Sequence, residues 1–235
     1  SAVGSYAVTG TVNDASWQGT NVGTLVIAKA AAAVALGDLA HTYDGTGKSA
    51  TATTVPEGRG VEITYDGSAT APSNAGSYAV TGTVNEADWQ GLATGTLVIA
   101  KAAATVALED LAQEYDGTAK PATATTAPIG LSVAFTYDGD TNAPVDAGAY
   151  AVTGTVDEVN WEGTATGTLV VARAEAVVTL GSLAQVYDGA GKSATATTVP
   201  AGLAVGFTYD GSTNLPVVVG AYAVTGMVDE ANWRG

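Results

Sequence analysis

One period organises the whole chain: four tryptophans stand 72 residues apart, at Trp17, Trp89, Trp161 and Trp233. Residues 29–100 align with residues 101–172 without a gap, and 48 of the 72 positions are identical. Such a chain folds as an array of one small unit in which each repeat contacts its neighbours. We therefore expect the C-terminal part of a truncated repeat at 1–28 and complete repeats at 29–100 and 101–172. Residues 173–235 then form a repeat that lacks its final strand.

The pattern inside one repeat predicts strands and no helix. Apolar residues occupy every second position at Leu131, Val133, Phe135 and Tyr137, which is typical of a half-buried strand. Asp-Gly pairs, such as 138–139, favour tight turns between strands. Residues 150–156 alternate again, and 157–163 is too short for a helix and reads as a turn. We predict an all-β tandem array of small antiparallel, immunoglobulin-like β-sandwich units, with a β-grasp-like sheet as the alternative.

The junction between repeats has no flexible spacer. Residues 168–180, from the predicted final strand of one repeat into the next, contain no proline or glycine. A joint of this composition is short and stiff, unlike a Gly/Ser coil. The sequence therefore predicts serial units that extend as a rod. The chain also starts and stops inside the repeat, so we expect it to be a window of a longer protein.

Composition excludes several classes of function. A net charge of −15 disfavours binding to nucleic acid, whose phosphates require a basic surface. No apolar run is long enough to insert into a membrane. With no cysteine and one histidine, neither a nucleophile–base pair nor a zinc cluster can be assembled. We expect no enzyme and no cofactor, with calcium left open because an acidic surface attracts cations.

Several phrases carry a resemblance to a known family. They are Tyr-Asp-Gly-Thr-Ala-Lys-Pro at 115–121, Thr-Tyr-Asp-Gly at 136–139, Ala-Pro-Val-Asp-Ala-Gly-Ala-Tyr-Ala-Val at 143–152 and Gly-Thr-Leu-Val-Val-Ala at 167–172. With their counterparts in the other repeats they resemble the MBG-type (YDG-containing) tandem repeat domain of bacterial surface and secreted, adhesin-like proteins. The resemblance implies an extracellular location, at the bacterial cell surface or secreted, and an all-β stalk module without catalytic residues. Trp161 departs from the pattern, where tyrosine is as frequent.

Two groups of residues are candidates for binding. Each tryptophan follows a predicted long strand and could stack on a sugar ring; the alternative is that its ring closes the end of the sandwich. The acidic loop Asp157, Glu158 and Asn160 is the candidate calcium site, although calcium requires six or more converging oxygens. The recurring lysines Lys48, Lys120 and Lys192 are expected to form ion pairs with acids.

Two functions remain open at this point. The first is a structural stalk or filament segment of a long extracellular surface protein, which projects a tip or builds a fibre. The second is a multivalent adhesive module that weakly binds glycan or a host protein through many copies. Partners are the neighbouring repeats and, in a fibre, other copies of the chain, where residues 20–28 could complete a neighbour head to tail by strand addition.

Overall fold

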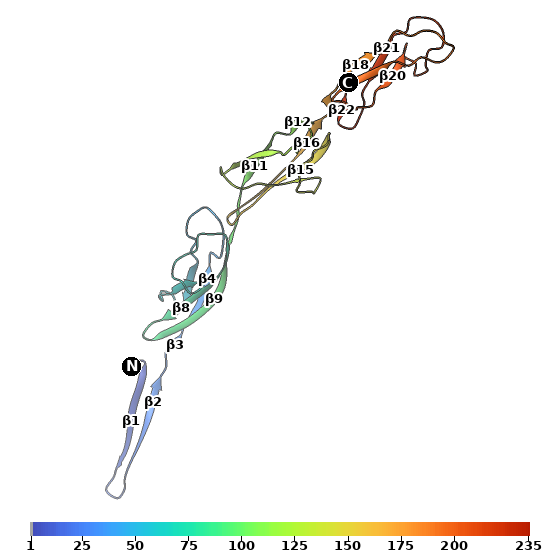
Figure 1. The fold of residues 1–235 in the computed structure, drawn as a ribbon. Helices are drawn as coiled ribbons and strands as arrows, with labels where there is room; N and C mark the ends of the chain where they lie inside the picture. The colour runs from blue at the N-terminus through green and yellow to red at the C-terminus, as the bar shows by residue number, and fades with distance from the viewer. Residues whose placement is uncertain (1) are drawn as a thin grey trace. The chain divides into compact units, whose positions relative to one another are not determined.

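The computed structural model describes residues 2–235, which form β-strands joined by turns, with no α-helix among them (Figure 1). The N-terminal segment is a hairpin of β1 (Gly4–Asn13) and β2 (Gln18–Ile27). The first complete repeat contains β3 (Ala30–Ala31), β4 (Ala33–Gly37), β5 (Ala40–Thr42), β6 (Thr51–Val55), β7 (Glu62–Tyr65), β8 (Gly76–Asn85) and β9 (Trp89–Ala100).

The second complete repeat has the same strands in the same order. They are β10 (Ala102–Ala103), β11 (Thr105–Glu109), β12 (Ala112–Glu114), β13 (Thr123–Ala127), β14 (Ala134–Tyr137), β15 (Gly148–Asp157) and β16 (Trp161–Ala172). The C-terminal repeat contains β17 (Ala174–Glu175), β18 (Val177–Gly181), β19 (Thr195–Val199), β20 (Gly206–Tyr209), β21 (Val224–Met227) and β22 (Trp233–Arg234). In the described part of the chain there is no helix that could cross a membrane.

The main sheet of a repeat is built around its last strand. In the first complete repeat β9 pairs antiparallel with β8, from Gly76↔Ile99 to Asn85↔Gln90, and β8 pairs with β7. Along its other edge β9 pairs in parallel with β3 and β5. A second layer, the antiparallel ladder of β4 and β6, packs over β8 and β9. The predicted all-β, sandwich-like unit is confirmed.

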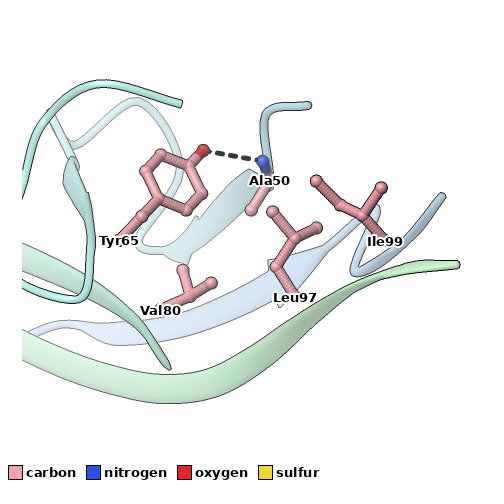
Figure 2. Close-up of a cluster of buried hydrophobic side chains, with 5 residues drawn as sticks. All are labelled: Ala50, Tyr65, Val80, Leu97 and Ile99. Atoms are coloured by element: carbon pink, nitrogen blue, oxygen red, sulfur yellow. Dashed lines mark hydrogen bonds between the residues drawn. The ribbon is translucent and has the colours of Figure 1, made fainter. Parts of the chain in front are cut away.

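The core between the layers explains the alternating pattern. Figure 2 shows its buried cluster in the first complete repeat, where Val80, Leu97 and Ile99 are at most 2% exposed. The Tyr65 hydroxyl accepts a hydrogen bond of 2.8 Å from the buried Ala50 N–H, which is drawn dashed in Figure 2. A buried N–H without a partner is costly, so this tyrosine satisfies the backbone as well as filling volume. The same bond recurs at Tyr137 and Tyr209.

One aspartate-glycine pair forms the predicted tight turn. Asp66 and Gly67 have φ values of 48° and 85°, and the flanking residues Tyr65 and Ser68 exchange both backbone hydrogen bonds. Positive φ at both central residues defines a type I′ turn, which matches the twist of the strands that it joins. Asp138-Gly139 and Asp210-Gly211 repeat this geometry.

The structure corrects three details of the sequence-based prediction. The sheets are mixed rather than wholly antiparallel, because short segments at the start of each complete repeat pair in parallel with its last strand. The strand predicted over 131–137 is limited to β14, since only residues 134–137 pair with β15. The predicted loop 157–163 is also shorter: β16 already begins at Trp161, because β10 supplies a parallel partner there.

Contacts between Cα atoms divide the chain into two compact units. The first comprises residues 1–103 with 158–162, and the second comprises residues 104–157 with 163–235. The hairpin tip at 158–162 is therefore grouped with the repeat that precedes it in the chain. Within the second unit the backbone passes close to the hairpin: a Cβ on Gly163 would lie 2.2 Å from the carbonyl oxygen of Ala104. Only glycine, whose side chain is a hydrogen atom, fits at position 163.

Candidate functional site

The most repeated polar feature of the chain is the tip of its long hairpin. In the β15–β16 hairpin the Glu158 N–H donates to the Trp161 carbonyl oxygen at 2.9 Å. The same bond closes the tips that end in Trp89 and Trp233, at 3.0 Å each, and the one that ends in Trp17, at 3.1 Å. Each hairpin tip therefore ends in Trp, and the residue before this Trp is Asn or Asp, or Ser in the first tip.

Asn160 fastens this tip to a loop that lies 85 residues earlier in the sequence. Its side-chain oxygen Oδ1 accepts a hydrogen bond of 2.8 Å from the Ala75 N–H. Its Nδ2 donates to Oδ1 of Asn74 at 3.0 Å, and its own carbonyl accepts from the Ala102 N–H at 2.9 Å. All these residues belong to the first compact unit. Both polar ends of the Asn160 side chain are thus occupied by protein groups.

The neighbouring tryptophan adds an aromatic contact to the same unit. The Trp161 ring meets Tyr43 edge to face, with ring centroids 5.6 Å apart and an interplanar angle of 81°. Pairs in this geometry contribute about 0.5–1.5 kcal/mol beyond the burial of their area. Tyr43 is held in turn by a backbone hydrogen bond of 2.9 Å from its N–H to the Ala100 carbonyl, at the end of β9.

The second unit repeats the arrangement at equivalent residues. Asn232 Oδ1 accepts from the Ala147 N–H at 2.8 Å, and its Nδ2 donates to Oδ1 of Asp146 at 2.9 Å. Trp233 meets Tyr115 at 5.6 Å and 84°. We call each set of tip Asn and Trp with its receptor loop and tyrosine a clasp. Two clasps of the same geometry indicate that the repeat sequence itself encodes the contact.

The four candidate ligand tryptophans occupy three different environments. Trp161 and Trp233 are half-buried in the clasps. Trp89 is half-buried beneath the guanidinium of Arg59, 5.2 Å from the ring centre, and is preceded by Asp88 instead of Asn. Trp17 is 75% exposed. An array of equivalent sugar-stacking rings is therefore absent from the described residues, and Trp17 is the tryptophan most accessible to a ligand.

The candidate calcium residues are engaged in protein contacts. Asn160 serves the first clasp, and Asp157 and Glu158 also have interaction partners. Their counterparts show the pattern: Glu86 Oε1 accepts from the Gly60 N–H at 2.7 Å, and its Oε2 pairs with Arg59 at 3.2 Å. The Gly60 N–H, with a smaller contribution from Arg59, lowers the pKa of Glu86. Among residues 2–235 no three acidic or histidine side chains gather as a metal site would require, and calcium binding stays a prediction.

A second recurring polar cluster braces the turn after each Tyr-Asp-Gly. Asp116 Oδ1 accepts from the Thr118 N–H at 2.8 Å and its hydroxyl at 2.6 Å, and Oδ2 pairs with Lys120 at 2.6 Å. The Lys120 ammonium, followed by these Thr118 donors, holds the pKa of Asp116 well below its usual range. The ion pairs predicted for the recurring lysines are confirmed here and at Asp44–Lys48 and Asp188–Lys192.

Sequence reasoning missed the receptor half of the clasp. Asn74 and Asp146 precede Ala75 and Ala147 in a loop without periodicity, and their partners are far along the chain. Tyr115 packs in part on the core of its own repeat, and its ring also meets Trp233. The sequence signal that could reveal the clasp is the recurrence of the pair Asn-Trp at 160–161 and 232–233.

Comparison with known proteins gives one family. A family model described as the MBG domain matches residues 1–31, 32–103, 104–175 and 176–235. The four matches cover the chain from end to end and carry the same period as the tryptophans. No curated protein sequence matches this chain.

Proposed function

The chain belongs to the MBG domain family, and from this premise we propose that it is a structural stalk or filament segment of a long bacterial surface or secreted protein. In this role it spans distance outside the cell and transmits tension between whatever lies at its two ends. It performs no catalysis and requires no cofactor.

The pairing of the first and last strands of each complete repeat supports this role. β3 and β5 lie at the start of the repeat and pair in parallel with β9, the last strand. When two parallel strands are pulled from opposite ends, the force acts along the strands and loads all the hydrogen bonds between them at once. An antiparallel hairpin that is pulled at its open end loses its hydrogen bonds one by one. A repeat with this pairing resists stretching in the direction in which a stalk is stretched.

Polar contacts of the junction residues support the same proposal. In the second unit, Arg173 pairs with Asp229, so the junction residue before β17 is tied to the turn that follows β21. Lys29 makes the corresponding hydrogen bond of 2.7 Å to Asn85 in the first unit. A single residue separates β9 from β10 and β16 from β17. These contacts restrict the bending that a free linker would allow.

Surface labelling tests the extracellular location. Antibodies raised against residues 29–100 are applied to intact bacteria that make the whole protein, and to the culture medium. We expect labelling of unbroken cells or recovery of the repeat from the medium. Labelling that requires lysis of the cells contradicts an extracellular stalk.

An adhesive role is the second candidate, and the exposure of Trp17 is the observation that favours it. If the chain binds glycans through this ring, tryptophan fluorescence should shift on addition of the glycan, and Trp17→Ala should remove that shift. Trp161→Ala is the matched control, since its ring already contacts Tyr43. An equal response in both variants contradicts a role for the exposed tryptophan.

A further inference from the structure

The two clasps differ at one residue of the receptor loop, and the difference is one of charge. In the first unit Asn160 Nδ2 donates to Oδ1 of Asn74, a neutral amide, at 3.0 Å. In the second unit Asn232 Nδ2 donates to Oδ1 of Asp146, a carboxylate, at 2.9 Å. Both receptor residues are exposed, whereas both tip asparagines are half-buried. One binding arrangement is therefore built with two different receptor side chains.

The residue at the tip position also varies between repeats. It is asparagine at 160 and 232, but in the repeat 29–100 it is Asp88. The Asp88 carbonyl accepts a hydrogen bond of 2.8 Å from the Ala30 N–H, and the Asn160 carbonyl accepts the equivalent bond from the Ala102 N–H at 2.9 Å. The backbone of the tip is thus the same with either residue. Asparagine and aspartate differ at this position in what their side chains can bind.

An aspartate tip keeps one of the two side-chain bonds of a clasp and changes the other. Its carboxylate can still accept from the receptor N–H, as Asn160 Oδ1 accepts from Ala75 at 2.8 Å. It has no donor, so the receptor side chain must donate instead. A receptor such as Asn74 can do so by turning its amide, which carries both a donor and an acceptor. A receptor such as Asp146 has only acceptors, and it places a second negative charge within hydrogen-bond distance.

We propose that the tip residue and the receptor residue form a recognition pair that determines which repeat can follow which. An asparagine tip fits both receptors, as the two clasps show. An aspartate tip fits an asparagine receptor and is repelled by an aspartate receptor. A repeat with an aspartate tip, such as 29–100, is therefore accepted after a repeat of the Asn74 type and rejected after one of the Asp146 type.

Such discrimination matters in a chain whose repeats are nearly alike. The two complete repeats are identical at 48 of 72 positions, and adjacent domains of similar sequence are prone to misassembly. Specificity requires that wrong pairs be disfavoured as well as correct pairs favoured, and two like charges in contact do this. The recognition pair goes beyond the stalk role and depends only on the clasps, so its test is independent of the surface labelling described above.

Hydrogen exchange of the complete 235-residue chain, followed by NMR at the Ala75 and Ala147 amides, tests the proposal. Asn232→Asp should accelerate exchange of Ala147 at least about tenfold, because repulsion separates the tip from its receptor. Asn160→Asp is the matched control, since it makes the same change opposite Asn74. Exchange of Ala75 in that variant should change by less than about threefold, because the receptor amide can donate.

Second-site variants separate charge repulsion from the loss of a hydrogen bond or of the fold. Asp146→Asn, added to Asn232→Asp, should restore slow exchange of Ala147. In the first unit, Asn74→Asp alone should have little effect, because the tip asparagine can donate to a carboxylate as it does in the second unit. Combined with Asn160→Asp, the same substitution should accelerate exchange of the receptor amide at least about tenfold.

Three results would overturn the proposal. Equal acceleration in Asn160→Asp and Asn232→Asp would show that the loss of the Nδ2 donor matters and the receptor residue does not. Failure of Asp146→Asn to restore slow exchange would exclude repulsion between these two side chains. Unchanged exchange of Ala147 in Asn232→Asp would show that an aspartate receptor accepts either tip.

Discussion

Replacing Asn160 with alanine should open the clasp of the first unit. The substitution removes the acceptor of the Ala75 N–H at 2.8 Å and the donor to Asn74 at 3.0 Å. A typical intramolecular hydrogen bond contributes about 0.5–1.5 kcal/mol, and these two are partly exposed, so we expect a local loss of about 1–2 kcal/mol. That loss corresponds to roughly 5–30-fold faster exchange of the Ala75 amide hydrogen.

Native-state hydrogen exchange followed by NMR measures this effect at a single amide. Asp88→Ala is the matched control: it holds the same position at the tip of the preceding repeat, but its carboxylate has no hydrogen-bond partner in residues 2–235. Asn232→Ala should accelerate exchange of Ala147 and leave Ala75 unchanged, because each clasp lies within its own unit. Unchanged exchange of Ala75 in a folded Asn160→Ala variant would refute the clasp.

Three further substitutions have defined outcomes. Gly163→Ala places a methyl group 2.2 Å from a backbone oxygen and should destabilise the protein by about 1–3 kcal/mol in chemical denaturation. Gly19→Ala is the control and should not destabilise the protein, because nothing lies within 4 Å of a methyl group at that position. Equal effects of the two substitutions would contradict the close approach. Tyr137→Phe leaves a buried N–H unpaired and should cost about 1–3 kcal/mol, and a neutral result contradicts that hydrogen bond. Because the pKa of Asp116 is lowered in the folded state, its stabilising effect is present above the ordinary value, about 3.9, and is lost as the pH falls below it. Asp116→Asn should therefore flatten the fall of Tm in acid, and a fall as steep as in the unchanged chain would show that the pair with Lys120 does not contribute.

The sequence predicts a strand correctly where the residue pattern within one repeat is enough to determine it. Val152 and Val156 alternate with polar residues, and both are 1% exposed in β15. The period-two pattern is enough, since a half-buried strand is the conformation that separates such residues onto two faces. The type I′ turn at Asp138-Gly139 was equally accessible, because it depends on local backbone preference.

Other features depended on contacts that no local pattern contains. The sequence predicts a turn at Trp161, because the parallel partner of this residue, β10, is a two-residue strand without a periodic signal. Leu131 has an apolar pattern of strand type but lies outside β14, since pairing with β15 begins at Ala134. The role of Asn160 was hidden for the same reason: its hydrogen-bond partners lie 85 and 86 residues away.

Single-molecule stretching tests most directly whether a repeat of this chain carries tension through its parallel strands. Handles at residues 29 and 100 pull β3 and β9 in opposite directions and load their pairing in shear. Handles at residues 76 and 100 pull β8 and β9 apart from one end. We predict one discrete unfolding event in the first geometry, with an extension of up to about 26 nm for 72 residues, at a markedly higher force than in the second. Equal forces in the two geometries, or extension without a discrete event, would contradict the structural role proposed for this chain.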